Sequence, residues 1–403
     1  MALLPVDEAL SRVLADAKPG PSETVSLAEA GGRVLAEDVV AARDQPPFPA
    51  SAMDGYAVRA ADISIIPARL EVIGEAAAGR RFSGEVGSGE AVRIFTGAPV
   101  PEGADTVLIQ ENARRHEDGT IEVLDATDRG RHIRRAGLDF AQGKTVLPAG
   151  RELDAAALSL AASANRPALR VHPIPVVAIL ATGDELVPVG AEPGPDQIVS
   201  SNGFGIAEIV RRAGGRALDL GIAPDREDAI AKSIQHAHEG GAAVIVTIGG
   251  ASVGDHDLVH KVLEAEGVEL GFWKIAMRPG KPLMFGSLGS ARVLGLPGNP
   301  VSALVCAHLF LAPLVSRLAG RPAVDPQREM KLGVDMDKNG DRQDYVRSRA
   351  ERQGDEWIAT PLEIQDSSML SALAASDVLI VRPPEAPAAK AGDICPVIRL
   401  RDL

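Results

Sequence analysis

The chain has 403 residues, of which 45% are hydrophobic, and its formal net charge at neutral pH is −13. At about 100–200 residues per domain, this length allows two to four domains with hydrophobic cores. The acidic balance and an aromatic content of 3% argue against a general nucleic-acid surface, which needs a basic stripe and stacking side chains. An anionic substrate would therefore need a local group of cations.

Neither secretion nor a membrane is indicated by the sequence. Cys306 and Cys395 lack the spacing of a metal site, so we expect two buried thiols in a reducing compartment. The opening stretch MALLPVDEAL has no basic start and no long apolar run, and no stretch reaches about 18 uninterrupted apolar residues. The sequence therefore predicts a soluble, cytoplasmic protein that binds neither nucleic acid nor membrane.

The first predicted element is a helix, because apolar residues between Val6 and Ala17 recur at helical spacing. Short segments follow over residues 24–42. From about 67 to 150, strand-like runs such as RLEVIGEA, DTVLIQE and TIEVLDA are separated by Gly, Pro and Asp-Gly turns, which predicts a small β-rich unit. Just before it, in PPFPASAMDGYAVRAAD, three prolines stiffen the chain ahead of Asp54.

The pattern changes after residue 150. A helix is predicted over 154–164, and strands then alternate with helices, one of which starts near Ser201 or Asn202 as its cap. The long helix from Pro300 to Leu318 ends this unit. Such alternation predicts a parallel sheet covered on both faces, with ligands beyond the carboxyl ends of its strands. Residues 330–402 return to short strands and predict a small β barrel or sandwich.

Carboxylates follow several of the predicted strands. Glu185 follows the first strand of the alternating unit, Asp225 follows the strand DLGIA, and Asp257 ends the stretch TIGGASVGDHD. Gathered at one sheet edge, these acids would suit a divalent cation on a phosphorylated substrate. On local grounds alone, Asp225 is better explained as the cap of the next helix, so both interpretations stay open.

Cations gather in one loop of this acidic chain. The stretch WKIAMRPGKPL places Lys274, Arg278 and Lys281 within eight residues and contains no acid. Three fixed cations suit a phosphate or another tetrahedral oxyanion. The glycine-rich turn TIGGASVGDHD adds Ser252 as a hydrogen-bond donor for an anion. A solvated basic loop and a plain tight turn remain the alternatives.

Other motifs are less specific. In GLPGNPVSAL, Asn299 is a natural helix cap, and Ser302 lies in the first turn, where an anion could bind. Thr96 follows a strand in FTGAPVP, where a simple turn is an alternative. Asp139 lies where the β-rich unit gives way to the helical part, so a hinge is plausible there. No histidine completes a catalytic triad, so covalent catalysis is poorly supported.

The motifs together resemble the MoeA family, the molybdopterin molybdenumtransferases, which are similar to the E domain of gephyrin. The stretches that support this resemblance are PPFPASAMDGYAVRAAD, TGAPVPEGADTV, ATGDEL, GGASVGDHD, FWKIAMRPGKPLMFG and GLPGNPVSAL. They occur in the family's order, and the resemblance covers nearly the whole chain. GDRQDYVR and IQDSSMLSAL, near the end, fit more loosely.

The resemblance implies a multidomain fold of class α/β plus β. Its expected domains are an α/β molybdopterin-binding domain with a parallel sheet (1–22 and 174–320), a linking domain (23–43 and 142–173), a β-rich domain (44–141) and a C-terminal β barrel (322–403). It also implies an elongated homodimer. The active cleft would lie between the α/β domain of one subunit and the β-rich domain of the other.

The resemblance further implies that the protein inserts molybdate into adenylated molybdopterin, with Mg²⁺, and releases AMP and molybdenum cofactor. An upstream pterin adenylyltransferase is the implied partner. The implied catalytic positions are Asp54, Thr96, Asp139, Glu185, Asp225, Asp257 and Lys274. The implied substrate or oxyanion positions are Ser252, Arg278, Lys281, Ser302, Arg347 and Ser368, or Ser367 in its place. The implied metal ligands are Glu185, Asp225 and Asp257.

The sequence departs from the family pattern at two points. Arg278 stands where many members carry Lys, so a planar fork replaces a point donor. TIGGAS replaces a more usual Ser-Gly-Gly-Val-Ser, which removes a hydroxyl. Two other functions are weighed against the transferase: a gephyrin-like dimeric scaffold without turnover and a pterin-binding adenylyltransferase. The complete set of acids argues against the scaffold, and the β-rich domain with SAMDGYA argues against the adenylyltransferase.

Overall fold

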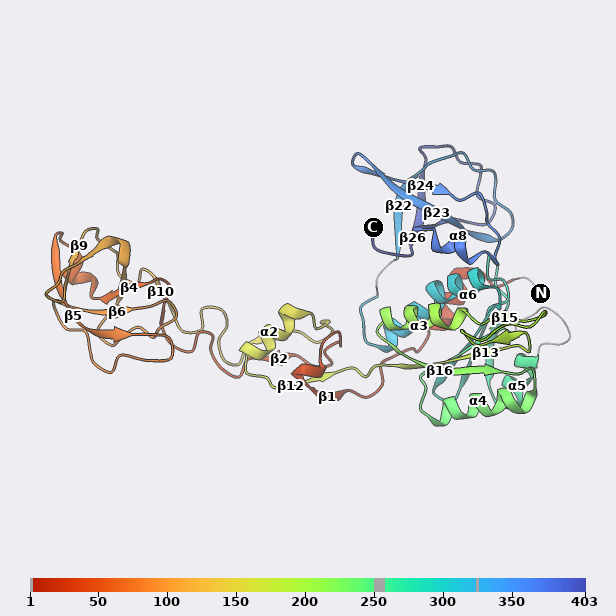
Figure 1. Ribbon diagram of the computed structural model, residues 1–403, viewed down its shortest axis with the longest axis horizontal. Coiled ribbons are helices and arrows are strands. Elements are labelled where there is room, and N and C mark those ends of the chain that lie inside the picture. The colour runs from red at the N-terminus through yellow and green to blue at the C-terminus, as the bar shows by residue number, and fades with distance from the viewer. Residues whose placement is uncertain (1–2, 250–257, 324–325) are drawn as a thin grey trace. The chain divides into compact units, whose positions relative to one another are not determined.

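The computed structural model describes residues 3–249, 258–323 and 326–403 (Figure 1). Internal contacts divide the chain into two compact units. The larger unit comprises Met1–Glu23, Gly32–Ala36 and Val171–Leu403, and the smaller unit comprises Thr24–Gly31 and Glu37–Arg170. The boundaries of the four domains expected from the family resemblance stay a prediction.

A six-stranded sheet lies at the centre of the larger unit, in the order β16-β13-β17-β21-β20-β18. Its strands are β13 (Val176–Thr182), β16 (Arg216–Ala223), β17 (Val244–Ile248), β18 (Glu269–Trp273), β20 (Met284–Leu288) and β21 (Ala291–Leu296). The parallel sheet is confirmed for β16, β13, β17 and β21. Strand β20 is antiparallel to both of its neighbours, β21 and β18, so the sheet is mixed. The turn between β20 and β21 is too short for the crossover that a parallel pair requires.

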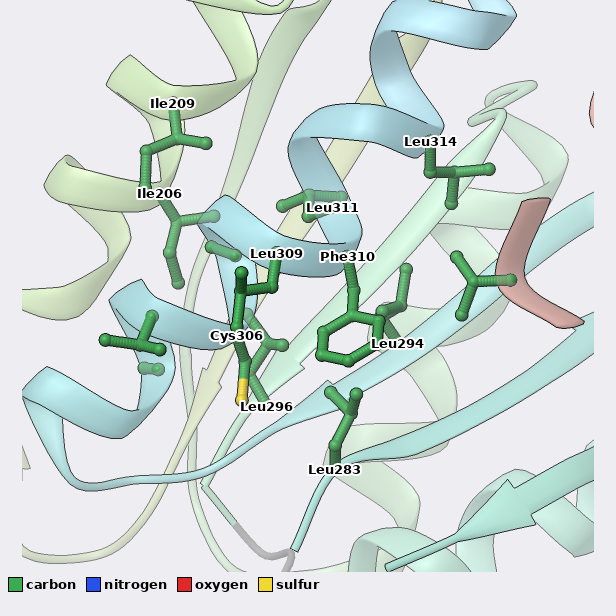
Figure 2. Packing of buried hydrophobic residues seen from close by; sticks show 14 of the residues in the cluster. Ile206, Ile209, Leu283, Leu294, Leu296, Cys306, Leu309, Phe310, Leu311 and Leu314 are labelled. Carbon is green, nitrogen blue, oxygen red and sulfur yellow. The ribbon is translucent and has the colours of Figure 1, made fainter. Parts of the chain in front are cut away.

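Helices cover both faces of this sheet. Their bounds are α1 (Val6–Leu14), α3 (Asn202–Arg212), α4 (Glu227–Glu239), α5 (Leu258–Ala265), α6 (Pro300–Cys306) and α7 (Ala312–Leu318). One hydrophobic cluster joins α1, α3, α6 and α7 to the sheet, and Figure 2 shows Phe310 and Cys306 of this cluster beside Leu294 and Leu296 of β21. A second cluster joins α4 and α5 to the sheet. The prediction that helices cover both faces of the sheet is therefore confirmed.

The helix predicted from Pro300 to Leu318 is present, with a π turn over Ala307–Leu311 between α6 and α7. Pro313 follows this turn at the start of α7. A proline inside a helix removes one N–H donor, and a π turn accommodates that loss. Among the described residues this is the one helix long and apolar enough to cross a membrane, but 61% of its most apolar window is buried inside the protein. Its apolar character is accounted for by the core.

A closed barrel forms the end of the larger unit. Strands β22 (Gln327–Leu332), β23 (Gln343–Gln353), β24 (Glu356–Pro361), β25 (Val378–Arg382) and β26 (Ile394–Arg399) pair in a ring that the β23–β25 ladder closes. The barrel, rather than a sandwich, is therefore the structure of this region. Helix α8 (Leu370–Ala374) lies between two of its strands in sequence. The short strand β19 (Met277–Arg278) pairs with β23, which joins the cationic loop to the barrel.

The smaller unit contains a six-stranded sheet in the order β7-β4-β6-β5-β9-β8, which confirms the β-rich prediction. Its strands are β4 (Gly55–Val58), β5 (Ala68–Ala76), β6 (Glu90–Ile94), β7 (Thr106–Ile109), β8 (Ala113–Arg115) and β9 (Thr120–Val123). Three two-stranded ladders pair β1 (Glu23–Ser26) with β12 (Ala168–Val171), β2 (Val39–Val40) with β11 (Thr145–Leu147), and β3 (Ala50–Ser51) with β10 (Ile133–Arg134). Short 3₁₀ turns lie at Leu27–Glu29, Ala60–Ile63 and Gln110–Asn112. The predicted helix near residue 154 is α2 (Ala155–Ser163), which Asp154 caps by accepting a hydrogen bond from the Ala157 N–H.

The predicted cap positions of α3 and α6 are confirmed. Ser201 and Asn299 do occupy the cap positions of α3 and α6, but neither side chain makes a capping hydrogen bond. The Asn202 amide donates to the Gly298 carbonyl at 2.8 Å, and the Asn299 amide donates to the Ser367 hydroxyl at 3.0 Å. These amides join loops that line the cleft described next.

Candidate active site

A cleft of about 1130 Å³ opens in the larger unit beside the carboxyl ends of β13 and β16. This is the sheet edge at which ligands bind in open α/β folds. Its wall includes Glu185, Asp225, Arg278, Lys281, Ser302 and Ser368. The barrel contributes Arg342, Gln365 and Ser367 as well as Ser368. The structure therefore brings together six of the residues implied by the family motifs.

Two acids form one side of this cleft. Glu185 follows β13, and the intervening Gly183 has a φ of 148°. A Cβ atom at position 183 would lie 2.3 Å from a carboxylate oxygen of Glu185, so glycine leaves room for that carboxylate. The Asp225 N–H donates to the Asp184 carboxylate at 3.1 Å, which ties the two loops together. Arg226 occupies the cap position of α4, so the interpretation of Asp225 as the helix cap is wrong.

No group of three His, Cys, Asp or Glu side chains in the described part of the chain is arranged to hold a metal ion. Glu185 and Asp225 are both exposed to the cleft, and carboxylate oxygens are the ligands that Mg²⁺ prefers. Asp257, the third expected ligand, and Ser252 lie outside the described residues. The donor chemistry of the two described acids fits a Mg²⁺ site.

The cleft wall also contains Arg278 and Lys281, but Arg278 is not a free cation. Its guanidinium donates to the carboxylate of Asp344 on β23, where the two residues are paired in register. The Asp344 side chain is only 9% exposed, whereas that of Arg278 is 61% exposed. The cationic loop contains no acid in its own sequence, but in the fold a buried acid of the barrel, Asp344, pairs with it.

Arg347 lies three residues after Asp344 on β23 and is 3% exposed. Its Nη1 donates to the Tyr345 carbonyl at 3.2 Å, while Nε and Nη2 have no hydrogen-bond partner among the described residues. Burial lowers the pKa of Arg347, although Asp344 opposes that shift. The side chain of Gln365, which lines the cleft, accepts a hydrogen bond from the Arg347 N–H and donates one to the Arg347 carbonyl. Arg347 itself is not among the residues that line the cleft, but it contacts Gln365, which does. A buried guanidinium with unpartnered donors calls for an explanation, and an anion is one that its chemistry fits.

The serines of the barrel differ in their contacts. The Ser368 N–H and hydroxyl both donate to the Asp366 carboxylate, at 2.8 and 2.7 Å, and these bonds lower the pKa of Asp366. The Ser367 hydroxyl accepts from Asn299, and its carbonyl accepts from the Val301 N–H. Ser302 is 5% exposed and lines the cleft. Ser367 thus joins the barrel to the start of α6, and both serines remain candidates for the uncertain position.

Lys274 does not line the cleft. Its Nζ lies 4.2 Å from the centroid of the Trp273 ring, and its backbone has a φ of 74°. Of the three cations expected at one site, Arg278 and Lys281 lie in the cleft wall, and a role for Lys274 there stays a prediction.

The smaller unit brings Asp54 and Thr96 together. The Asp54 carboxylate accepts hydrogen bonds from the Thr96 N–H at 2.7 Å and from its hydroxyl at 2.8 Å. The pKa of Asp54 is lowered, first by the bond from the N–H and then by the bond from the hydroxyl. A Cβ atom at Gly55 would lie 1.9 Å from the Leu108 carbonyl, so the glycine permits the close pairing of β4 with β7. Asp139 lines a different cavity of about 620 Å³, with Phe48, Gly97 and Arg134 among its neighbours.

Several residues of the cleft were missed by the sequence analysis. They are Asn202, Lys261, Arg342, Gln365 and, as the partner of Arg278, Asp344. The last three lie in GDRQDYVR and IQDSSMLSAL, the two stretches whose fit to the family was loose. Asn202 was considered only as a helix cap, because a Ser-Asn pair before an apolar run has that local explanation.

Three family models match successive parts of the chain. The MoeA N-terminal region (domain I and II) matches residues 4–165, the probable molybdopterin binding domain matches 178–317, and the MoeA C-terminal region (domain IV) matches 329–400. The chain is 40% identical over 321 residues to the molybdopterin molybdenumtransferase of Haemophilus influenzae, covering 79% of this chain and 78% of that one. It is 32% identical over 407 residues to the Bacillus subtilis protein of the same name, covering 99% and 94%.

Solved structures give the same result. The structure of the molybdopterin biosynthesis MoeA protein from Pyrococcus horikosii is similar, with a TM-score of 0.85, 30% sequence identity, and complete coverage of both chains. A second structure of MoeA from Pyrococcus horikoshii OT3 has a TM-score of 0.81 and 28% identity. Similarity therefore extends over all the elements described above.

Proposed function

The chain belongs to the MoeA family of molybdopterin molybdenumtransferases, and on this basis we propose that it inserts molybdate into adenylated molybdopterin, releasing AMP and molybdenum cofactor. The observation that best supports the proposal is Arg347, a buried guanidinium with two donor nitrogens that have no partner among the described residues, next to Gln365 of the cleft wall. Its relatives' names favour neither the scaffold nor the adenylyltransferase.

The cationic side of the cleft would bind the tetrahedral oxyanion. Molybdate is a dianion, and the acidic chain as a whole repels it, so the donors must be local. Arg347 offers Nε and Nη2, Lys281 offers an ammonium group, and Ser302 offers a buried hydroxyl in the cleft wall. Arg278 is held by Asp344, so its remaining guanidinium donors would face the ligand in a fixed direction. These residues bind and orient the oxyanion rather than react with it.

The acidic side would hold the cation. We propose that Glu185 and Asp225, with Asp257, bind Mg²⁺. When bound, Mg²⁺ would neutralise charge on the phosphoanhydride of the adenylated substrate. The two loops that present Glu185 and Asp225 are tied together by the hydrogen bond from the Asp225 N–H to Asp184. That bond keeps both carboxylates at the same sheet edge.

The oligomeric state and cellular context are proposed from the family alone. We propose a cytoplasmic homodimer, in which the Asp54 segment of one subunit completes the cleft of the other, supplied by the upstream pterin adenylyltransferase. Asp54, Thr96 and Asp139 would act from the β-rich domain, and Lys274 from the cationic loop. Mixing Asp54→Ala with Lys274→Ala subunits should restore activity above that of either parent. No gain in any mixture would show that sites are not shared.

The decisive test is AMP release from adenylated molybdopterin, measured with and without molybdate. A transferase should release AMP and form cofactor in a molybdate-dependent way, whereas a scaffold should release none. Lys281→Ala should raise the molybdate concentration needed by about tenfold to a hundredfold, since each charge-assisted bond contributes about 1.5–3 kcal/mol. Arg278→Lys, which keeps the charge, should be mild. If Lys281→Ala abolished pterin binding without changing the molybdate dependence, Lys281 would belong to the pterin phosphate.

A further inference from the structure

The indole of Trp273 contacts two side chains that can carry positive charge. The Lys274 Nζ lies 4.2 Å from the ring centroid, and the His260 ring stacks on the same indole with centroids 4.7 Å apart and an interplanar angle of 21°. The indole Nε1 is buried and has no hydrogen-bond partner among the described residues. Both of these contacts are made through the ring faces of the indole, and one of them is the contact with the ammonium group.

The backbone of Lys274 is fixed close to the cleft even though its side chain is not in it. Its N–H donates to the Leu283 carbonyl, and the next N–H donates to the Lys281 carbonyl. Between these anchors, the loop over Arg278–Pro282 lines the cleft. A φ of 74° is uncommon for a lysine, so the surrounding hydrogen bonds hold this conformation.

A lysine side chain on a four-carbon stem loses rotamer entropy when it is held in one place. The contact with Trp273 offsets that loss in the absence of a ligand. An anionic phosphate in the cleft would compete for the same ammonium, because a charge-assisted hydrogen bond is stronger than an exposed cation–π contact. The ammonium thus has two positions to choose between, one over the ring and one toward the anion.

We propose that Trp273 is a positioning residue that holds the Lys274 ammonium over its indole when the cleft is empty and releases it to a phosphate ester bound there. This inference rests on the proposed function, since it assumes that the cleft takes a phosphorylated ligand. It adds a role for Trp273, and it explains why Lys274 lies outside the cleft wall.

The sequence contains two tryptophans, so Trp357→Phe leaves Trp273 as the only indole fluorophore. In that background, Lys274→Met should change the emission of the ligand-free protein, because the charge over the ring is lost. The matched control is Lys232→Met, which removes an exposed lysine from α4 and should leave the emission unchanged. Identical emission with and without Lys274 would overturn the proposal.

Titration with AMP, as the phosphate ester probe, should give a saturable emission change in the Trp357→Phe protein and a much smaller one after Lys274→Met. An equal change in both proteins would show that the ammonium does not move. This optical test needs no turnover, so it gives a result even if the proposed transferase activity is not found.

The KM of Trp273 variants distinguishes a positioning role of Trp273 from a purely structural one. Trp273→Phe keeps an aromatic face and should retain the KM of the unmodified protein, whereas Trp273→Leu should lower the KM for adenylated molybdopterin by about threefold to thirtyfold, because the cation–π contact no longer competes with the ligand for the ammonium. Equal KM values for the Phe and Leu variants, at equal thermal stability, would contradict the positioning role.

Discussion

The two sides of the cleft differ in how firmly their charged groups are held. On the barrel side, Arg347 is 3% exposed and the Arg278 guanidinium is bound to a buried carboxylate. On the sheet side, Glu185 and Asp225 are exposed at the ends of loops. A tetrahedral anion is recognised by donors fixed in advance, whereas Mg²⁺ keeps several of its waters and is bound through one or two carboxylates, which can therefore stay exposed to solvent. The difference in burial therefore matches the difference in the two proposed ligands.

Fixation on the barrel side has an energetic cost. Burying a guanidinium without partners for Nε and Nη2 disfavours the folded state, which is also why burial lowers the pKa of Arg347. An anion bound by Nε and Nη2 would offset this cost. The exposed acids of the sheet side carry no comparable cost. Variants on the barrel side should consequently change both stability and ligand binding, whereas variants on the sheet side should change ligand binding alone.

The largest effect is expected for Arg347→Met. Loss of one or two charge-assisted bonds to the oxyanion should weaken molybdate binding by about tenfold to a hundredfold or more. The free energy of unfolding should stay the same or rise, because the buried unpaired charge is removed while the stem volume is kept. Isothermal titration with molybdate and thermal unfolding of the same samples measure both effects.

The matched control is Arg349→Met, because Arg349 lies two residues further along β23 and is exposed. It should change neither molybdate affinity nor stability. A large loss of stability in Arg347→Met without a change in affinity would assign Arg347 to the barrel structure and remove the main support for the oxyanion site.

A second comparison lies within the Arg278–Asp344 pair. Arg278→Met leaves a buried carboxylate without its partner, which should cost about 1–3 kcal/mol of unfolding free energy. Asp344→Asn leaves an exposed guanidinium that water can solvate, so its cost should stay below about 1 kcal/mol. Denaturant unfolding of the two variants and of Arg278→Lys gives the order. Equal losses for Arg278→Met and Asp344→Asn would show that the burial asymmetry has no energetic consequence.

Most of the fold could be predicted from the sequence, because its information is local. Helical spacing between Val6 and Ala17 and the apolar run from Pro300 to Leu318 gave correct helices. The mixed part of the sheet was missed because an apolar strand such as β20 looks the same in either direction, and only the two-residue turn after it sets its direction. Asn299 occupies the predicted cap position of α6, but its side chain bonds to Ser367, and Arg226 rather than Asp225 occupies the cap position of α4.

The site could be predicted only in part. Glu185, Asp225, Lys281 and Ser302 lie where strand ends and motifs indicated. The contact of Arg278 with Asp344 joins residues 66 positions apart, so no spacing rule could show it. The contact of the Lys274 ammonium with the Trp273 ring could not be predicted from the sequence either. The two residues are adjacent, but their rotamers depend on the packing of the loop. The family resemblance supplied residue roles that local patterns could not.

On the sheet side, Glu185→Gln and Asp225→Asn should each raise the Mg²⁺ concentration that gives half-maximal AMP release, without weakening molybdate binding. Each variant removes one hard oxygen charge but keeps the size of the side chain. Asp196→Asn, which removes an exposed carboxylate from a nearby loop, is the matched control and should leave the Mg²⁺ dependence unchanged. Full activity of the unmodified protein in excess chelator would exclude the metal role altogether.

Gly183→Ala tests the same side through the backbone. The added Cβ would lie 2.3 Å from the Glu185 carboxylate, and alanine is strained at a φ of 148°. The Glu185 carboxylate should move, so the Mg²⁺ dependence should shift in the same direction as in Glu185→Gln. An unchanged dependence in Gly183→Ala, with a lowered melting temperature, would mean that the Glu185 carboxylate is not the ligand.

The smallest effect is expected in the other unit, at Asp54. Its pKa is lowered mainly by the Thr96 N–H, which Thr96→Ala keeps, and second by the hydroxyl, which Thr96→Ala removes. The pKa of Asp54 should therefore rise only part of the way toward its ordinary value. If turnover needs the Asp54 carboxylate, the acid limb of the kcat/KM profile should move to higher pH, and activity at neutral pH should hardly change. A lowered carboxyl pKa stabilises the fold above the unfolded pKa, and this stabilisation is lost as the pH falls through the folded pKa. The variant should therefore have a smaller stabilisation from Asp54 at neutral pH, and its loss should be complete at a higher pH. Thr96→Ser retains the hydroxyl and should keep the original profile. An acid limb that stays in place in Thr96→Ala would mean that a different group sets it.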